Sequence, residues 1–328
     1  MREQVPLSTF QAALGDQYIL ERELPRGGMS RVFVATETAL GRHVVVKVLS
    51  SEVAATLSAD RFKREIAMAA QFQHPHIIPL LSAGQAGAYL YYTMPLVDGE
   101  SLRERIDRER PMAIADITRI LSEVASALDY AHAGKMIHRD IKPENVMFYH
   151  GHAVVLDFGI GKALSEALEQ NPAFPRFKTT AHKPLGTAMY MAPEQIRAEP
   201  DLDHRADLYA LGVVAYEMIT GHPPFTGKSV QAIFSAHANQ APDPIAPRRE
   251  GVPPRLTAIV MKALEKEPAK RPQSGEEIVR AIAGISSDKA PWGVPAVLAR
   301  APVWLPWAIA VVSTGVAIVL GLMLSRAR

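Results

Sequence analysis

The eight residues from His138 to Asn145 combine side chains that phosphoryl transfer needs in one place. The carboxylate of Asp140 can accept a proton from an attacking hydroxyl group, and the ammonium group of Lys142 can neutralise charge on the transferring phosphoryl group. The carboxamide of Asn145 can bind a metal ion that bridges phosphates. The segment therefore predicts a catalytic loop.

The composition indicates a globular protein without cysteine chemistry. The 328 residues suffice for one large or two modest domains, and a hydrophobic fraction of 48% suffices for a packed core. The 36 basic and 34 acidic residues nearly balance, so charge does not favour binding to nucleic acid. The absence of cysteine excludes disulfides and thiolate metal sites, and it favours a cytosolic main body. Residues 1–20 lack the apolar run of a secretory signal.

Two regions with different hydrophobic patterns must position the loop. Residues 18–97 contain β-branched runs separated by glycine, and one helical pattern over residues 60–72. Residues 98–285 contain amphipathic helical patterns over 114–133, 206–220, 256–264 and 275–285. We therefore expect an α+β protein with a small β-rich lobe, which has one main helix, and a larger helical lobe.

The order of the motifs resembles that of bacterial, eukaryotic-like (Hanks-type) serine/threonine protein kinases. The catalytic loop has the form HRDxKPxN, Asp157-Phe158-Gly159 follows an apolar strand, and Ala192-Pro193-Glu194 comes later. The resemblance covers residues 18–285 and implies the bilobal kinase fold with ATP bound between the lobes. Lys142, two residues after the catalytic aspartate, matches kinases that act on serine and threonine.

The resemblance assigns further residues to the nucleotide site. Gly27 and Gly28 occupy the place of the glycine-rich phosphate loop, although Pro25 and Ser30 stand where the family pattern has glycine. The segment that begins at residue 94 matches the hinge, which reads adenine through backbone groups. The further residues assigned to binding of the nucleotide are Val32, Val45, Met94, Pro95, Val97 and Met147.

The phosphate and metal contacts are also implied by the resemblance. Lys47 corresponds to the lysine that contacts the α- and β-phosphates, and Glu65 to the glutamate that pairs with that lysine. Asn145 and Asp157 supply oxygen ligands, which suit Mg²⁺ or Mn²⁺. Thr187 is expected to orient the acceptor hydroxyl group near the catalytic loop.

Regulation is predicted from the segment between the metal motif and residue 194. Arg139 matches an arginine that receives a phosphate group carried by this segment. Thr179 and Thr180 are the hypothetical autophosphorylation sites, and unmodified loop threonines are the alternative. A homodimer would allow such autophosphorylation.

Two matches predict structural roles. Glu194 is expected to form a buried ion pair with Arg271, and Asp207 to brace the catalytic loop from the helix over 206–220. Neither acidic residue is expected to contact the substrate.

The C-terminal residues 304–324 predict a single transmembrane helix. No charged residue lies between Ala301 and Ser325, and the apolar run approaches the roughly 20 residues that span a bilayer. All three tryptophans precede or begin this run, as in an interfacial aromatic belt. A buried C-terminal helix is the alternative.

The expected organisation follows from these assignments. Its segments are an N-terminal extension 1–17, a kinase domain 18–285 with an N-lobe of about 18–97 and a C-lobe of about 98–285, a juxtamembrane linker 286–303, the membrane helix 304–324 and a tail 325–328. We expect a single-pass protein of the inner or plasma membrane with its kinase domain in the cytoplasm. Gly315 and Gly321 lack the G-x-x-x-G spacing of helix dimers, so the sequence gives little support for a dimerising role of this helix.

The resemblance implies transfer of the γ-phosphoryl group of ATP to serine and threonine hydroxyl groups of protein substrates. The alternative is a membrane-tethered pseudokinase scaffold. Only Pro25 and Ser30 favour the scaffold, because the lysine, glutamate, aspartates and asparagine that kinases require are all present.

Overall fold

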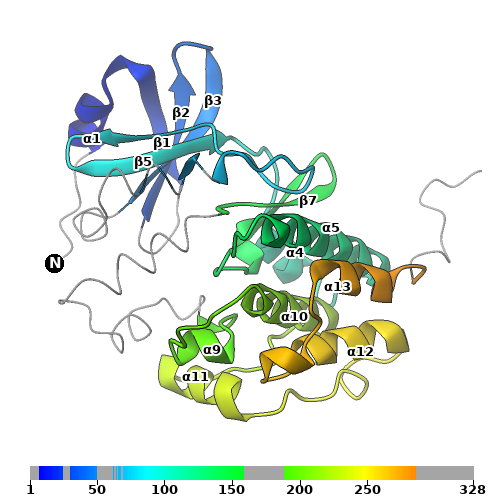
Figure 1. The fold of residues 1–328 in the computed structure, drawn as a ribbon. Coiled ribbons are helices and arrows are strands. Elements are labelled where there is room, and N and C mark those ends of the chain that lie inside the picture. Colours follow the sequence, from blue (N-terminus) through cyan, green and yellow to red (C-terminus); the bar gives the residue numbers. More distant parts are fainter. Residues whose placement is uncertain are drawn as a thin grey trace, which may run out of the picture. The chain divides into compact units, whose positions relative to one another are not determined.

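Alternation of apolar residues builds a five-stranded antiparallel sheet from the first third of the chain (Figure 1). In spatial order the strands are β1 (Tyr18–Leu24), β2 (Ser30–Glu37), β3 (Arg42–Leu49), β5 (Tyr89–Pro95) and β4 (Ser82–Ala86). Because side chains alternate across a strand, Val45 and Leu49 point to the face that joins the main core, whereas Val44 and Val46 point to a second cluster on the other face. Lys47 therefore shares the main-core face.

The structure is a computed structural model, and it describes residues 7–24, 30–49, 62, 64, 66, 67, 69–158 and 188–285. The chain divides into two units, Met1–Ser286 and Ser287–Arg328. All described residues belong to the first unit.

A short N-terminal helix, α1 (Leu7–Leu14), packs against the sheet face opposite the main core. The ring of Phe10 stacks on Phe33 at 5.8 Å between centroids and meets Tyr89 edge to face at 5.6 Å. The sequence predicts residues 1–17 only as an N-terminal extension, so helix α1 is a feature that the sequence does not predict. The turn η1 (Gly15–Gln17) connects it to β1.

Gln11 of α1 also hydrogen-bonds to the backbone of β1. Its Oε1 accepts a hydrogen bond from the backbone N–H of Leu20 at 2.8 Å, and its Nε2 donates to the carbonyl oxygen of Tyr18 at 2.9 Å. One side chain thus satisfies a donor and an acceptor on the side of β1 that faces away from β2.

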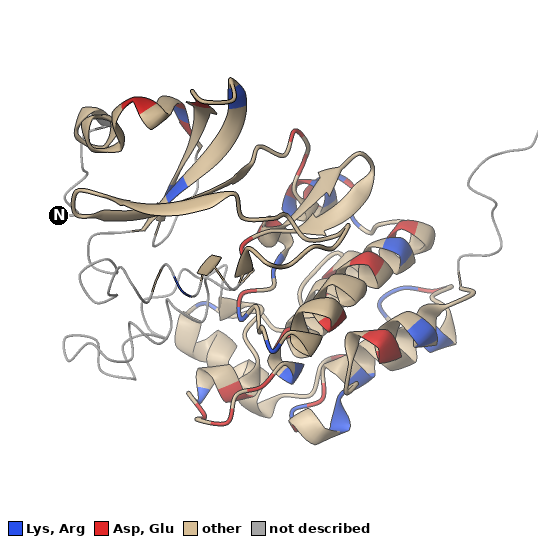
Figure 2. Ribbon diagram, turned by 45° about the horizontal axis from the view of Figure 1, so that its top comes forward, with Lys and Arg blue, Asp and Glu red and all other residues tan. Residues whose placement is uncertain are grey.

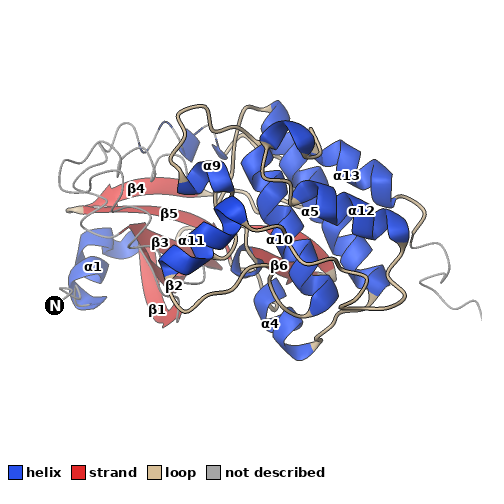
Figure 3. Cartoon of the chain, turned by 90° about the horizontal axis from the view of Figure 1, so that it is seen from below, coloured by secondary structure: helices blue, strands red, loops and turns tan. Residues whose placement is uncertain are grey.

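The second lobe is helical, as Figure 3 shows in blue. Its helices are α4 (Leu102–Arg108), α5 (Ile114–Ala133), α9 (Pro193–Ile196), α10 (Arg205–Thr220), α11 (Val230–Asn239), α12 (Pro254–Ala263) and α13 (Gly275–Ile282). Helix α10 is buried on all sides and contacts α5 and α12, while α13 packs on α5. Gly221 ends α10 with φ +81°, the left-handed conformation that closes many helices.

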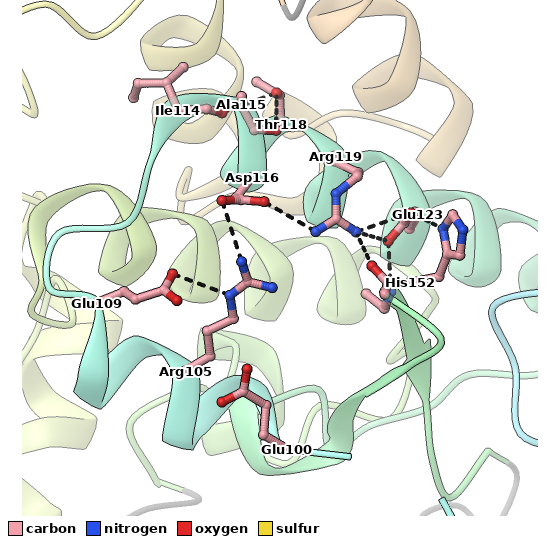
Figure 4. A network of polar contacts seen from close by, with 12 residues as sticks. Glu100, Arg105, Glu109, Ile114, Ala115, Asp116, Thr118, Arg119, Glu123 and His152 are labelled. Carbon is pink, nitrogen blue, oxygen red and sulfur yellow. Dashed lines mark hydrogen bonds and ion pairs between the residues drawn. The ribbon is translucent and has the colours of Figure 1, made fainter. Parts of the chain in front are cut away.

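A two-stranded hairpin carries the segment between the catalytic loop and residue 157. Its strands are β6 (Val146–Tyr149) and β7 (His152–Val155), and the turn η2 (Pro143–Asn145) precedes it. Glu123 of α5 accepts hydrogen bonds from the N–H of Ala153 at 2.7 Å and from His152 Nδ1 at 2.8 Å (Figure 4). These contacts fix β7 on α5.

The same network ties α4 to α5. Arg105 of α4 contacts Asp116 of α5 at 3.4 Å, and Arg119 donates to the carbonyl oxygen of Gly151 at 2.7 Å (Figure 4). Acidic and basic residues are interspersed along the C-lobe helices in Figure 2. Such mixed charge supports solubility rather than attraction to one charged partner.

The predicted bilobal fold is confirmed, with a β-sheet N-lobe and a helical C-lobe. Of the helix predicted over 60–72, the described residues 62, 64, 66, 67 and 69 are helical, and Phe62, Ile66 and Ala69 are buried in the main core. The predicted membrane helix 304–324 lies outside the described residues. Within the described part of the chain, no helix combines the length and apolar character that crossing a bilayer requires.

Candidate active site

The catalytic loop gathers the three side chains predicted to act on phosphate. Lys142 Nζ lies 2.7 Å from Asp140 Oδ2, and Asn145 Nδ2 donates to the same oxygen at 3.0 Å. Asn145 Nδ2 also donates to the backbone carbonyl of Asp140 at 2.8 Å. The Asp140 side chain is 37% exposed, so its carboxylate is both held in place and accessible to an incoming hydroxyl group.

Asp207, in the first turn of the buried helix α10, hydrogen-bonds to the backbone at the start of the catalytic loop. Its carboxylate accepts hydrogen bonds from the backbone N–H groups of His138 and Arg139, both at 2.8 Å, and contacts His132 Nε2 at 2.9 Å. Arg139 has φ +66°, a costly conformation that these bonds help to fix. The predicted bracing role of Asp207 is confirmed.

The charge state of Asp207 suits this role. Burial raises the pKa of its carboxyl group. The hydrogen bond and charge of His132, together with His138, lower the same pKa by a larger amount. The net pKa lies below the ordinary aspartate value, so the group stays ionised and accepts hydrogen bonds at neutral pH.

His138 joins the catalytic loop to the metal motif, a link that the sequence does not predict. His138 Nε2 lies 2.7 Å from the carbonyl oxygen of Leu156, and its ring meets Phe158 edge to face at 4.8 Å. The N–H of Asp140 donates to His138 Nδ1 at 3.2 Å, which places the ring proton on Nε2. The one imidazole therefore sets the spacing of the two loops.

Asp157 lies between the lobes and receives contacts from the sheet. Lys47 Nζ is 2.7 Å from its Oδ2, and the hydroxyl group of Tyr92 donates to its Oδ1 at 2.8 Å. Asp157 has φ +66°, the left-handed region that an aspartate tolerates only at some cost. Glu65, the predicted partner of Lys47, lies outside the described residues.

Asn145 and Asp157 together form a donor set that fits a magnesium ion. The N–H of Leu156 donates to the Asn145 carbonyl oxygen at 2.9 Å, so the two predicted ligands come from adjoining backbone segments. The Asn145 amide nitrogen faces Asp140, which leaves its Oδ1 for a cation. A carboxylate and an amide oxygen suit Mg²⁺, which commonly takes its other ligands from phosphates and water. No group of three or more histidines, cysteines, aspartates or glutamates with metal-binding geometry occurs among the described residues.

The apolar residues predicted to bind the nucleotide fall into one cluster. Val32, Val45 and Met94 are buried in it, and Val97 and Met147 are half-buried against it. Cross-strand pairing sets Val45 opposite Met94, and Pro95 is the last residue of β5, where the chain leaves the sheet.

The segment after the hinge lies directly against β6. A Cβ atom on Gly99 would come 2.0 Å from the carbonyl oxygen of Phe148, so only glycine allows this approach. Phe148 donates its N–H to the carbonyl oxygen of Glu100 at 2.9 Å, and Ser101 pairs with Met147. This contact holds Met147 beside the hinge.

The predicted buried ion pair of the C-lobe is confirmed. Arg271 Nη1 and Nη2 donate to the two carboxylate oxygens of Glu194 at 2.6 and 2.7 Å, and both side chains are almost fully buried. Beside it, Gln195 Nε2 donates to the carbonyl oxygen of Arg139 at 3.0 Å. The segment that follows residue 187 is thereby attached to the catalytic loop.

Several predicted site residues lie outside the described part of the chain. They are Gly27, Gly28, Glu65, Thr179, Thr180 and Thr187. Their assigned roles stay predictions.

Comparisons with known proteins agree with this geometry. The protein kinase domain family matches residues 18–281. The chain is 38% identical to the serine/threonine-protein kinase PknB of Mycobacterium tuberculosis strain H37Rv over 276 residues, which is 82% of the chain and 43% of that protein. It is also 38% identical to PknB of Mycolicibacterium smegmatis over 284 residues, covering 85% of the chain and 44% of the relative. For the serine/threonine-protein kinase pkn3 of Myxococcus xanthus the identity is 37% over 287 residues, covering 83% and 50%.

The chain thus spans half or less of the length of these curated relatives. The matched region nevertheless contains both lobes and every site residue described above. By this match, which extends over most of its length, the chain belongs to the protein kinase domain family.

Proposed function

We propose that this protein is a serine/threonine protein kinase, which transfers the γ-phosphoryl group of ATP to hydroxyl groups of protein substrates with the help of Mg²⁺. The observation that carries the proposal is the contact of Lys142 and Asn145 with one oxygen of Asp140. The names of the relatives support the serine/threonine class.

The side chains divide the work of the reaction. Asp140 orients the acceptor hydroxyl group and takes its proton, while Lys142 stabilises negative charge on the transferring group. Lys47 holds nucleotide phosphates from the sheet side. A divalent ion bound by Asn145 and Asp157 supplies charge neutralisation at the phosphates when it is present.

Replacement of the proposed base tests the activity. Asp140→Asn keeps the size of the side chain but removes the proton acceptor, and we expect phosphate transfer to fall by about 100-fold or more. The measurement is transfer from labelled ATP with Mg²⁺ to a basic protein rich in serine and threonine. Asp201→Asn serves as the matched control, since Asp201 is exposed.

Two outcomes would contradict the proposal. One is transfer by Asp140→Asn at the rate of Asp201→Asn. The other is absence of transfer by the unaltered protein, which would favour the pseudokinase scaffold.

We also propose that the protein autophosphorylates Thr179 and Thr180, and that Arg139 binds the resulting phosphate group. Arg139 Nε is buried and has no hydrogen-bond partner among the described residues, and a phosphate group would satisfy it. Mass spectrometry of active protein is expected to find phosphate on at least one of these threonines. Unmodified Thr179 and Thr180 in fully active protein would contradict this assignment.

Membrane anchoring by residues 304–324, with the kinase domain in the cytoplasm, is a further proposal. It is supported by the uncharged stretch between Ala301 and Ser325 and by the tryptophans before it. We expect the protein to sediment with membranes after a carbonate wash and to enter detergent. Recovery of the intact chain in the aqueous fraction would contradict anchoring.

A further inference from the structure

The hydroxyl group of Tyr92 contacts Asp157 of the metal motif, although Tyr92 itself belongs to no sequence motif. It lies on β5 directly opposite Lys47 of β3, and its side chain is fully buried. The two cross-strand neighbours contact different oxygens of one carboxylate: Tyr92 donates to Asp157 Oδ1 at 2.8 Å, and Lys47 Nζ lies 2.7 Å from Oδ2. The Lys47 Nζ atom is also 5.8 Å from the centre of the Tyr92 ring.

The strand period explains why Tyr92 can reach this place. Residues 90, 92 and 94 of β5 face the main core, whereas Tyr91 faces the second cluster, beside Phe10 and Tyr18. A buried tyrosine hydroxyl group needs a hydrogen-bond partner. Simple satisfaction of that group by a nearby acceptor is the purely structural alternative, and it predicts no effect on the metal ion.

The acceptor is not an ordinary core group, however. Asp157 is the predicted metal ligand, and its backbone has φ +66°. Rotation of a carboxylate about its last bond meets only low barriers. A donor fixed in a sheet therefore sets the plane of this carboxylate, whereas the flexible side chain of Lys47 can follow it.

We propose that Tyr92 is a positioning residue for metal binding: its hydroxyl group holds Asp157 Oδ1, so that Oδ2 faces the phosphates and the metal ion. The inference rests on the proposed function, in which Asp157 is a metal ligand. Outer groups that orient a metal ligand typically change metal affinity by 10- to 100-fold when they are removed. Tyr92 has no other assigned role in the reaction.

The test compares two adjacent tyrosines in the full-length protein. Tyr92→Phe and Tyr91→Phe each remove one hydroxyl group from a buried tyrosine of β5, but on opposite faces of the sheet. Binding of a fluorescent adenosine diphosphate analogue is measured with a chelator and then over a range of Mg²⁺ concentrations. The readout is the Mg²⁺ concentration that gives half of the gain in nucleotide affinity.

We expect Tyr92→Phe to need about tenfold more Mg²⁺ than the unaltered protein, because its metal ligand is no longer oriented. The nucleotide affinity of Tyr92→Phe without Mg²⁺ should stay within about twofold of that of the unaltered protein, since the lost hydroxyl group acts through the metal ligand. The Mg²⁺ requirement of Tyr91→Phe should also stay within about twofold, since Tyr91 faces the second cluster and not Asp157. Asp157→Asn sets the scale for loss of the ligand itself. Thermal unfolding of each variant, followed by circular dichroism, shows that the fold persists.

An unchanged Mg²⁺ requirement in Tyr92→Phe would overturn the inference and leave the proposed function intact. An equal shift in Tyr91→Phe would overturn it as well, because the effect would then belong to the sheet rather than to Asp157. Absence of any Mg²⁺ effect in the unaltered protein would overturn the metal role of Asp157, and the inference with it.

Discussion

His237 of α11 is fully buried and shows how one residue can make the stability of the C-lobe depend on pH. The Nδ1 atom of His237 lies 2.9 Å from the Tyr209 hydroxyl group, and the imidazole ring meets Phe225 edge to face. Burial, together with the positive charge of Lys266, lowers the pKa of His237 to about 3, while a backbone contact with Met189 opposes the shift. The folded protein therefore keeps this imidazole neutral where an unfolded chain would protonate it.

The sign of the pH effect follows from this difference. Below the unfolded pKa of 6.5 the unfolded chain binds a proton that the folded chain does not, so stability falls as pH falls towards 3. At pH 5 the contribution is about 2 kcal/mol, since each pH unit corresponds to about 1.4 kcal/mol. We expect urea unfolding at pH 7 and pH 5 to show this loss, and His237→Asn to show a smaller one.

Comparison with that variant isolates one group, because burial also lowers the pKa of His74 and His74 is present in both proteins. Equal losses in the two proteins between pH 7 and pH 5 would contradict the assignment.

Sequence motifs predict single residues where chemistry requires both a residue type and a spacing. Asp140, Lys142 and Asn145 are found in mutual contact because a short loop leaves them little freedom. Tyr92 could not be predicted in the same way, since its role depends on strand register with Lys47. That register is set by long-range pairing, which a single sequence does not reveal.

At the scale of elements, α13 packs so closely on α5 that only glycine fits at its first position. A Cβ atom at Gly275 would come 2.2 Å from the carbonyl oxygen of Ala125 and 2.9 Å from Asp129 Cβ. Ser274 caps the helix, and the N–H of Glu276 donates to Asp129 Oδ1 at 3.0 Å. These contacts fix the start of α13 in place.

Gly275→Ala is therefore expected to destabilise the protein, although alanine favours a helix over glycine by about 1 kcal/mol. Overpacking against a backbone atom typically costs about 1–3 kcal/mol, which exceeds that gain. Denaturant unfolding measures the net change. Glu276→Ala, at an exposed position of the same helix, should change stability by no more than about 0.5 kcal/mol. Stabilisation by Gly275→Ala would show that the two helices can move apart.

Long helices with strong periodicity are predicted best from this sequence. The pattern over 114–133 matches α5, and the pattern over 206–220 falls within α10. The helices α1, α4 and α11, of seven to ten residues, are missed, although the patterns over 256–264 and 275–285 predict α12 and α13, which are of similar length. Helices this short offer few turns for a clear period, and tertiary packing stabilises them. In α1, Phe10 and Leu14 gain their burial from a sheet that is distant in sequence.

At the scale of the whole molecule, the two lobes are joined at the site by a few polar contacts. Lys47 and Tyr92 come from the sheet, and Asp157 follows the hairpin of the helical lobe. The overall architecture was predictable because the motifs occur along the chain in the same order as the strands and helices that contain them. The lobe contacts were not predictable, since they join residues 65 and 110 positions apart.

The hydrogen bonds of Gln11 to β1 bear on where the chain can be cut. The family match begins at residue 18, so a fragment started there would lose α1 and expose the backbone of an edge strand in the described sheet. Exposed strand edges accept strands from other molecules and promote aggregation. We expect a fragment of residues 18–285 to self-associate in light scattering more than a fragment of residues 1–285, with Gln11→Ala in the longer fragment intermediate. Helix α1, which lies outside the family match, therefore protects the edge of β1 from pairing with other molecules.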